Sequence, residues 1–140
     1  MIYYLIASIL IAVTALFART KRAVLAAGIL FYAVQIAAAG LLLWGGLYDT
    51  TSAAFFTFDA LGTLFYLLLV VVSMYVFGHS EAYLQGEDLR SYRLYFALLM
   101  LLTTAIAGAY FANNLAVTWI FLEATTLCSA GIVYHRRTAQ

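Results

Sequence analysis

Apolar residues run almost without interruption through five stretches of the chain, and polar residues gather between these stretches. A helix needs roughly 20 apolar residues to cross the hydrocarbon core of a bilayer. Each stretch comes near this length, so the pattern predicts an all-α membrane fold, a single domain over residues 1–140 with five transmembrane helices. The predicted helices cover residues 1–18, 23–47, 60–78, 94–111 and 115–134.

Four polar connections separate the predicted helices, and their order along the chain is RTKR, YDTTSAAFFTFD, HSEAYLQGEDLRSYR and ANN. The last connection is so short that the fourth and fifth helices must form a tight antiparallel hairpin. The sequence contains no proline, so no helix is expected to bend at one.

The basic residues of the chain are confined to alternate connections. They are Arg19, Lys21 and Arg22 in the first connection, Arg90 and Arg93 in the third, and Arg136 and Arg137 after the last helix. Cytoplasmic loops of membrane proteins carry an excess of Lys and Arg. The pattern therefore predicts an N-terminus outside and a C-terminus in the cytoplasm. We expect a multi-pass protein of a prokaryotic inner membrane.

The first apolar stretch has a second interpretation, a secretory signal peptide. Signal peptides carry their positive charge before the apolar run, whereas here Arg19, Lys21 and Arg22 follow it. We therefore expect a retained first helix.

Composition supports an integral membrane protein and excludes several other classes. The chain is 66% apolar and only 9% charged, with a mean hydropathy of +1.00, whereas soluble domains carry about 25% charged residues. A net charge of +1 without a basic arm gives no case for nucleic-acid binding. The single cysteine, Cys128, cannot form an intrachain disulfide.

We expect no metal or redox cofactor in this chain. His79 and His135 have no further nitrogen, sulfur or carboxylate at metal-ligand spacing, and both are read as interfacial residues. No P-loop, GxGxxG, HExxH or CxxC pattern occurs, so the sequence indicates neither a nucleotide site nor a zinc or iron–sulfur site.

One carboxylate, Glu123, stands ninth in the last apolar stretch. An acid at mid-bilayer costs about 2.5–3.5 kcal/mol and marks a candidate ion or proton path. One helical turn away on the same face, only Thr126 offers a polar side chain. Because no Lys or Arg lies inside any predicted helix, two interpretations stay open. Glu123 is either a protonated acid hydrogen-bonded to a neighbouring helix, or a proton-path acid whose cationic partner comes from another polypeptide or another part of the same one.

Three stretches of the sequence resemble one family in order and spacing. They are FDALGTLFYLLL from Phe58, HSEAYLQGEDLRSYRLYFALLM from His79 and ANNLAVTWIFLEATTLCSAGIV from Ala112. The family comprises the antiporter-like, proton-conducting membrane subunits of respiratory complex I (NADH-quinone oxidoreductase), of the related membrane-bound hydrogenases and of the multisubunit sodium/proton antiporters. The matching residues are Asp59, Leu61, Gly62, His79, Ser80, Tyr83, Asn114, Leu115, Trp119, Glu123 and Leu127.

The resemblance covers about residues 55–134 and implies a role for the whole chain. Glu123 would correspond to the family's fifth-helix glutamate, which pairs with a lysine on a later helix and gates proton movement. Family subunits have many more helices, built as two inverted repeats, so the resemblance implies an N-terminal portion of such a subunit. The FDALG stretch looks most like the hydrogenase branch. The chain would have membrane lipid and other subunits of a redox complex as partners, one of them supplying the lysine, and would do no redox chemistry itself.

Two interpretations of Asp59 stay open, and so do alternatives to the main functional interpretation. Asp59 is either a polar element of transport or an N-cap that accepts hydrogen bonds from free backbone amides at a helix start, and we favour the cap. The alternatives to a proton-translocating subunit are a small homodimeric exporter that exchanges protons for a cationic drug through Glu123, and a purely structural membrane subunit.

Overall fold

The computed structural model describes residues 1–45, 55–84 and 86–138, and their side chains as far as Tyr134. The regular structure of these residues is entirely helical, which confirms the predicted all-α fold. The five helices are α1 (Ile2–Phe17), α2 (Lys21–Leu43), α3 (Ala60–Tyr83), α4 (Leu89–Phe111) and α5 (Leu115–Thr138).

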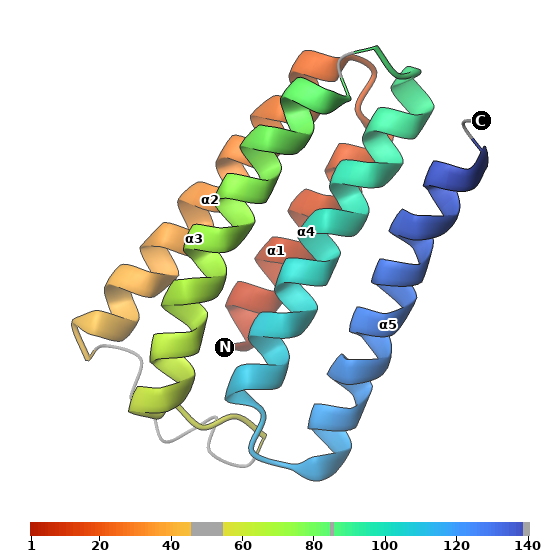
Figure 1. Cartoon of the computed structure of the whole chain (residues 1–140). Helices are drawn as coiled ribbons and strands as arrows, with labels where there is room; N and C mark the ends of the chain where they lie inside the picture. The colour runs from red at the N-terminus through yellow and green to blue at the C-terminus, as the bar shows by residue number, and fades with distance from the viewer. Residues whose placement is uncertain (46–54, 85, 139–140) are drawn as a thin grey trace.

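Successive helices run in opposite directions, and α4 lies at the centre of the arrangement (Figure 1). Helices α1 to α4 form a bundle in which α4 contacts each of the other three. Helix α5 lies outside this bundle and packs against α4 alone among the described helices. One whole side of α5 is therefore uncovered.

Four of the five helices, α2 to α5, are long and apolar enough to cross a membrane. The chain is thus a multi-pass integral membrane protein by the length and composition of its helices. Helix α1 is equally apolar but has 16 residues, about 24 Å at 1.5 Å per residue, against a hydrocarbon core of roughly 30 Å. Its own passage through the membrane stays a prediction.

Two helices extend further into the polar connections than the sequence predicted. Helix α3 continues past residue 78 to Tyr83, and α4 begins at Leu89 rather than at residue 94. The prediction was wrong there because hydropathy marks where a helix leaves the hydrocarbon, whereas the backbone hydrogen bonds continue in the headgroup layer. The third connection is consequently only residues 84–88.

The second helix is displaced from its predicted bounds of residues 23–47. It begins at Lys21, behind a Thr20 N-cap whose Oγ1 accepts a hydrogen bond from the Ala23 amide at 3.2 Å. It ends at Leu43, because Gly45 takes a φ of 73°, a left-handed conformation that ends helices and favours glycine. The predicted end at residue 47 lies outside the described residues.

Aromatic rings and small residues fit together in the core of the bundle. The ring of Phe77 in α3 lies directly over Gly28 of α2, where a Cβ would overlap it. The same ring meets Phe96 of α4 edge to face, with 4.8 Å between the ring centroids. Glycine at position 28 thus lets α2 and α3 approach closely.

The alternation of the helices brings the basic connections to one end of the molecule, the upper end in Figure 1. There the Arg93 guanidinium in the first turns of α4 donates to the Ala18 carbonyl at 3.1 Å. The Lys21 ammonium lies 5.4 Å from the centroid of the Tyr92 ring. These contacts hold the starts of α2 and α4 beside the end of α1.

At the opposite end, the segment before α3 pairs with the connection between α4 and α5. The Thr57 amide donates to the Phe111 carbonyl at 2.8 Å, and the Asn113 amide donates to the Phe55 carbonyl at 2.8 Å. The two bonds form an isolated antiparallel bridge between Phe56 and Ala112. We call this pair of bonds the 56–112 bridge; it ties the start of α5 to the start of α3.

Candidate functional site: the outer face of α5

Helix α5 begins with a side-chain cap at Asn114. The Asn114 Oδ1 accepts a hydrogen bond from the Ala116 amide at 2.9 Å, and its carbonyl accepts from the Thr118 amide at 2.9 Å. An N-cap asparagine satisfies an amide that has no partner inside the helix. This motif residue therefore sets the point at which α5 starts, and with it the position of Glu123 further along.

The side of α5 that packs on α4 follows a regular pattern. Phe121 lies on Gly108 of α4, and Leu98 of α4 lies against Gly131. Phe121 also faces Phe56, with ring centroids 6.1 Å apart. Half-buried residues continue this α4-facing seam at steps of four and three positions: Val117, Phe121, Ala124, Cys128 and Gly131.

A second seam with the same spacing runs along the opposite side of α5. Each of its residues is exposed, and they are Trp119, Glu123, Thr126, Ala130 and Val133. It is offset by two residues from the α4-facing seam, or about 200° around the helix. Alternating steps of four and three positions are the spacing at which one helix packs along another. We call this set the outer seam; nothing in the described residues covers it.

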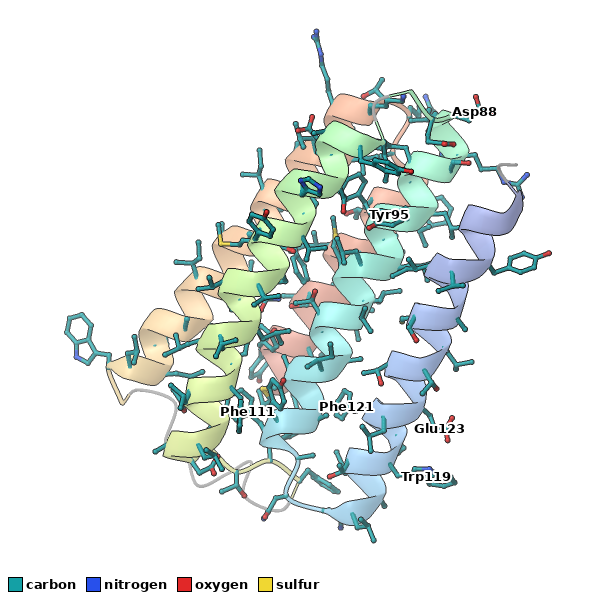
Figure 2. The ribbon with its side chains drawn as sticks, in the orientation of Figure 1. Asp88, Tyr95, Phe111, Trp119, Phe121 and Glu123 are labelled. Carbon is teal, nitrogen blue, oxygen red and sulfur yellow. The ribbon has the colours of Figure 1, made fainter. Side chains whose placement is uncertain are left out.

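Glu123 lies in the outer seam, next to Trp119, which is 64% exposed. Figure 2 shows both side chains projecting from α5 away from α4, whereas Phe121 projects toward α4. Glu123 is eight residues beyond Leu115, the first residue of α5, which places it about 12 Å along the helix axis. The carboxylate is thus well inside the apolar segment, yet outside the four-helix bundle.

Thr126 does not use its hydroxyl hydrogen on the Glu123 carboxylate. Its Oγ1 donates to the Glu123 backbone carbonyl at 2.8 Å, a bond within the helix that serine and threonine often make. The hydroxyl oxygen keeps its lone pairs, so Thr126 can still accept a hydrogen bond from a group that approaches the outer seam.

The positive charges of the chain are far from Glu123. Along α5 the next one is Arg136, 13 residues further, or about 20 Å at the helical rise. All the other Lys and Arg residues belong to the first and third connections or the first turns of the helices next to them, at the same end of the molecule as Arg136. The positions of the Lys and Arg residues in the sequence and the order of the helices therefore leave no side-chain cation of this chain at the depth of Glu123.

Asp59 is an N-cap, as favoured from the sequence. Its carboxylate accepts a hydrogen bond from the Gly62 amide at 3.0 Å, and its carbonyl accepts from the Thr63 hydroxyl at 2.8 Å. A Cβ on Gly62 would overlap the carboxylate, so the small residue leaves room for the cap. The local bonds account for Asp59 without a transport role.

Three further motif residues, His79, Ser80 and Tyr83, lie at the other end of α3. The Ser80 hydroxyl lies 2.9 Å from the Tyr95 hydroxyl of α4, and His79 stacks on Tyr75 one turn earlier, with ring planes 5° apart. Tyr83, the last residue of α3, is 68% exposed. The structure therefore does not bring these three residues together with Glu123.

A buried polar group that was not predicted lies inside the bundle. Gln35 of α2 is fully buried, and its side-chain carbonyl accepts hydrogen bonds from Tyr4 of α1 and Tyr66 of α3. The available signal was a lone amide within an apolar stretch, because a polar side chain in a membrane needs a partner.

Comparisons of the chain with protein-family models, with curated proteins and with solved structures gave no match. Its function is therefore argued from its own residues.

Proposed function

We propose that this chain is the N-terminal helical part of an antiporter-like, proton-translocating membrane subunit of a redox complex of the NADH-quinone oxidoreductase or hydrogenase type. In this proposal Glu123 holds or relays a proton, and a helix outside residues 1–140 covers the outer seam and presents a lysine to Glu123. The chain itself performs no redox chemistry. The single observation that carries the proposal is the position of Glu123 in the outer seam of α5.

The residues of the outer seam favour a protein helix, rather than lipid, as the group that covers them. An acid facing acyl chains carries a cost of about 2.5–3.5 kcal/mol with no compensating contact. A helix packed along the seam excludes lipid from the carboxylate, and small residues such as Thr126 and Ala130 let its backbone come close. Because intramembrane carboxylates pair with one another or with cations, the partner helix is expected to carry a basic side chain.

A second copy of this chain fits the seam less well. Two copies related by an axis along the membrane normal would place one Glu123 opposite the other, and like charges at short distance disfavour ionisation of both. No Lys or Arg of the copy lies at that depth. The homodimeric exporter remains the alternative, because a cationic substrate held between two carboxylates would supply the missing charge.

The orientation and the cellular membrane belong to the same proposal. The basic end of the bundle faces the cytoplasm by the positive-inside rule, so the Asn114 end faces outward in a prokaryotic inner membrane. Helix α1 also crosses the membrane in this proposal, which brings the number of spans to five. Its shorter length is compensated by packing along α2 and α4, and a bilayer thins locally around a short segment.

The test of the proposal is the substitution Glu123→Gln in the membrane complex that contains the chain. Membrane vesicles from cells carrying either form are energised with the electron donor of the complex, and acidification is followed with a pH-sensitive dye. We expect proton transport to fall at least tenfold in Glu123→Gln, with the amount of assembled complex unchanged.

Glu87→Gln is the matched control, because it makes the same chemical change in the connection between α3 and α4. It should transport at the wild-type rate. Full transport by Glu123→Gln would overturn the role of Glu123. Binding of a lipophilic cation by the purified chain alone, abolished by Glu123→Gln, would favour the exporter instead.

A further inference from the structure

A cluster of polar side chains fills the centre of the α1–α3 region, on the other side of α4 from the outer seam. Its members are Ser8, Tyr4, Gln35 and Tyr66. The Gln35 Oε1 accepts hydrogen bonds from the Tyr4 hydroxyl at 2.6 Å and from the Tyr66 hydroxyl at 2.8 Å. The Tyr4 and Tyr66 rings meet edge to face, with centroids 6.1 Å apart. Three helices thus converge on one amide.

Two polar atoms of this cluster have no hydrogen-bonding partner among the described residues: the Gln35 Nε2 and the Ser8 Oγ. Both side chains are fully buried, and Ser8 lies one turn from Tyr4 on the same side of α1. The amide can donate two hydrogens and the hydroxyl one. Since hydrocarbon offers no partner for them, these donors need something that the protein side chains do not supply.

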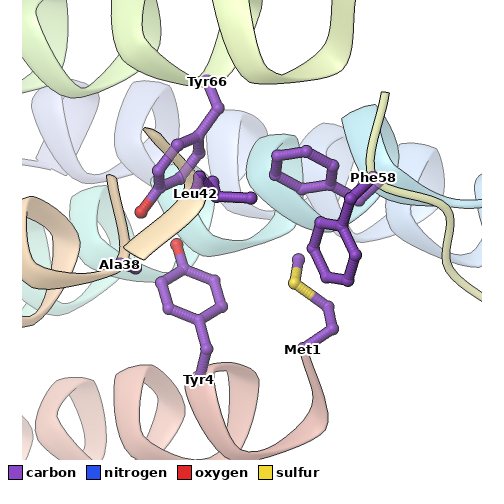
Figure 3. A pocket seen from close by; sticks show the side chains of 7 residues that line it. Met1, Tyr4, Ala38, Leu42, Phe58 and Tyr66 are labelled. Atoms are coloured by element: carbon purple, nitrogen blue, oxygen red, sulfur yellow. The ribbon is translucent and has the colours of Figure 1, made fainter. Parts of the chain in front are cut away.

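A small and mostly apolar cavity of about 30 Å³ lies beside the cluster; Tyr4 and Tyr66 belong to its lining, whereas Gln35 and Ser8 lie beyond it. Tyr4 and Tyr66 border it on one side. Met1, Leu42, Phe58 and Phe111, which lie at helix ends or just before helix starts, line the other side. Figure 3 shows the Tyr4 and Tyr66 hydroxyls pointing toward each other, with Met1 and Phe58 on the side of the helix ends. One water molecule needs roughly 10–15 Å³ of such space, so the cavity is large enough for water and far too small for an acyl chain.

The cavity leads inward from the end of the molecule at which α5 begins. Tyr66 is six residues from the start of α3, and Gln35 is eight residues from the end of α2, which places them about 9 and 12 Å from that end. Glu123 lies at a similar depth on α5. The cluster is therefore an internal polar position at the level of the outer-seam carboxylate, separated from it by α4.

We propose that ordered water binds at the Gln35 amide and the Ser8 hydroxyl, beyond the inner end of the cavity, and that it enters past Tyr4 and Tyr66 from the Asn114 end of the bundle. The water accepts hydrogen bonds from the Gln35 amide and the Ser8 hydroxyl and donates to the tyrosine oxygens, so every polar atom of the cluster has a partner. This inference rests on residues of α1, α2 and α3 alone. It stands or falls separately from the role of Glu123.

X-ray hydroxyl-radical footprinting of the full chain in lipid nanodiscs tests the proposal, because radicals formed from bound water oxidise the side chains that touch it. We expect Tyr66 to be oxidised at least threefold faster than Tyr32, which is also buried but donates its hydroxyl hydrogen to the Ser73 carbonyl at 2.8 Å. Oxidation of Tyr66 no faster than that of Tyr32 would overturn the proposal.

The variant Ser8→Ala gives a second, independent readout through the sign of its effect. Removal of a hydroxyl that is bonded to water lowers the melting temperature, whereas removal of a buried hydroxyl without any partner raises it. We expect a lower melting temperature for Ser8→Ala, and an unchanged or higher value contradicts bound water at Ser8. Ser129→Ala on the exposed side of α5 is the control, and its melting temperature is expected to equal that of the wild type.

Discussion

The ring of Phe121 in α5 lies directly on Gly108 of α4, so close that a Cβ at position 108 would overlap the ring. Because α5 packs on α4 alone among the described helices, this contact is one of those that hold α5 beside the bundle.

Gly108→Ala is therefore expected to weaken the packing of α5 on α4. Overpacking of a close contact costs about 1–3 kcal/mol, and SDS titration of the purified chain in mixed micelles measures the loss of stability. Gly40→Ala in α2 is the control, since a Cβ there meets nothing within 4 Å; its stability should change by less than about 0.5 kcal/mol. Equal effects of the two substitutions would show that Phe121 does not rest on Gly108.

Tyr66→Phe removes the hydroxyl that bonds both the Gln35 Oε1 at 2.8 Å and the Gln35 backbone carbonyl at 3.1 Å. Hydrogen bonds between membrane helices contribute on average about 0.6 kcal/mol and at most about 1.7 kcal/mol, and we expect a loss in this range in the same titration. Tyr75→Phe, at a 75% exposed position of the same helix, should leave stability unchanged. A loss of the same size at Tyr75 would refute the interpretation.

Asp59→Ala is expected to destabilise the start of α3 by about 1 kcal/mol, because the Gly62 amide loses its acceptor. Asn caps as well as Asp does, so Asp59→Asn should keep wild-type stability and wild-type transport. A transport defect in Asp59→Asn without a loss of stability would instead indicate that the charge itself takes part in transport.

The orientation of the chain is open to a direct measurement. With Cys128 replaced by Ala, single cysteines are introduced as Asn113→Cys and as Gly86→Cys, at opposite ends of the bundle. A membrane-impermeant maleimide added to intact cells should label position 113 and not position 86, and permeabilised cells should be labelled at both. The reverse pattern would place the basic end outside, against the positive-inside rule.

Much of the helical framework could be predicted from the apolar stretches and from the polar residues that separate them. Asp59 and Asn114 stand at helix starts because their side chains accept from local backbone amides, an interaction between residues two or three positions apart. The ends of α3 and α4 in the third connection were not predictable from hydropathy, since a helix does not stop where the hydrocarbon stops.

Long-range arrangements were beyond the sequence patterns we used. The convergence of Tyr4, Gln35 and Tyr66 joins three helices at separations of 31 residues, and nothing local in the chain specifies which span meets which. The two seams of α5 share one spacing, so the sequence alone does not say which of them rests on α4. Glu123 could be recognised from the sequence as an acid in an apolar segment, but the direction of its side chain depends on how Phe121 docks.

The 56–112 bridge fixes the start of α5 to the bundle through backbone hydrogen bonds. Asn113 is bonded to Phe55 immediately before the helix starts, whereas the Tyr134 end, as far as its side chains are described, is held by packing on α4. A partner that displaces α5 is therefore expected to move its Tyr134 end further than Glu123, which lies nearer to the bridge.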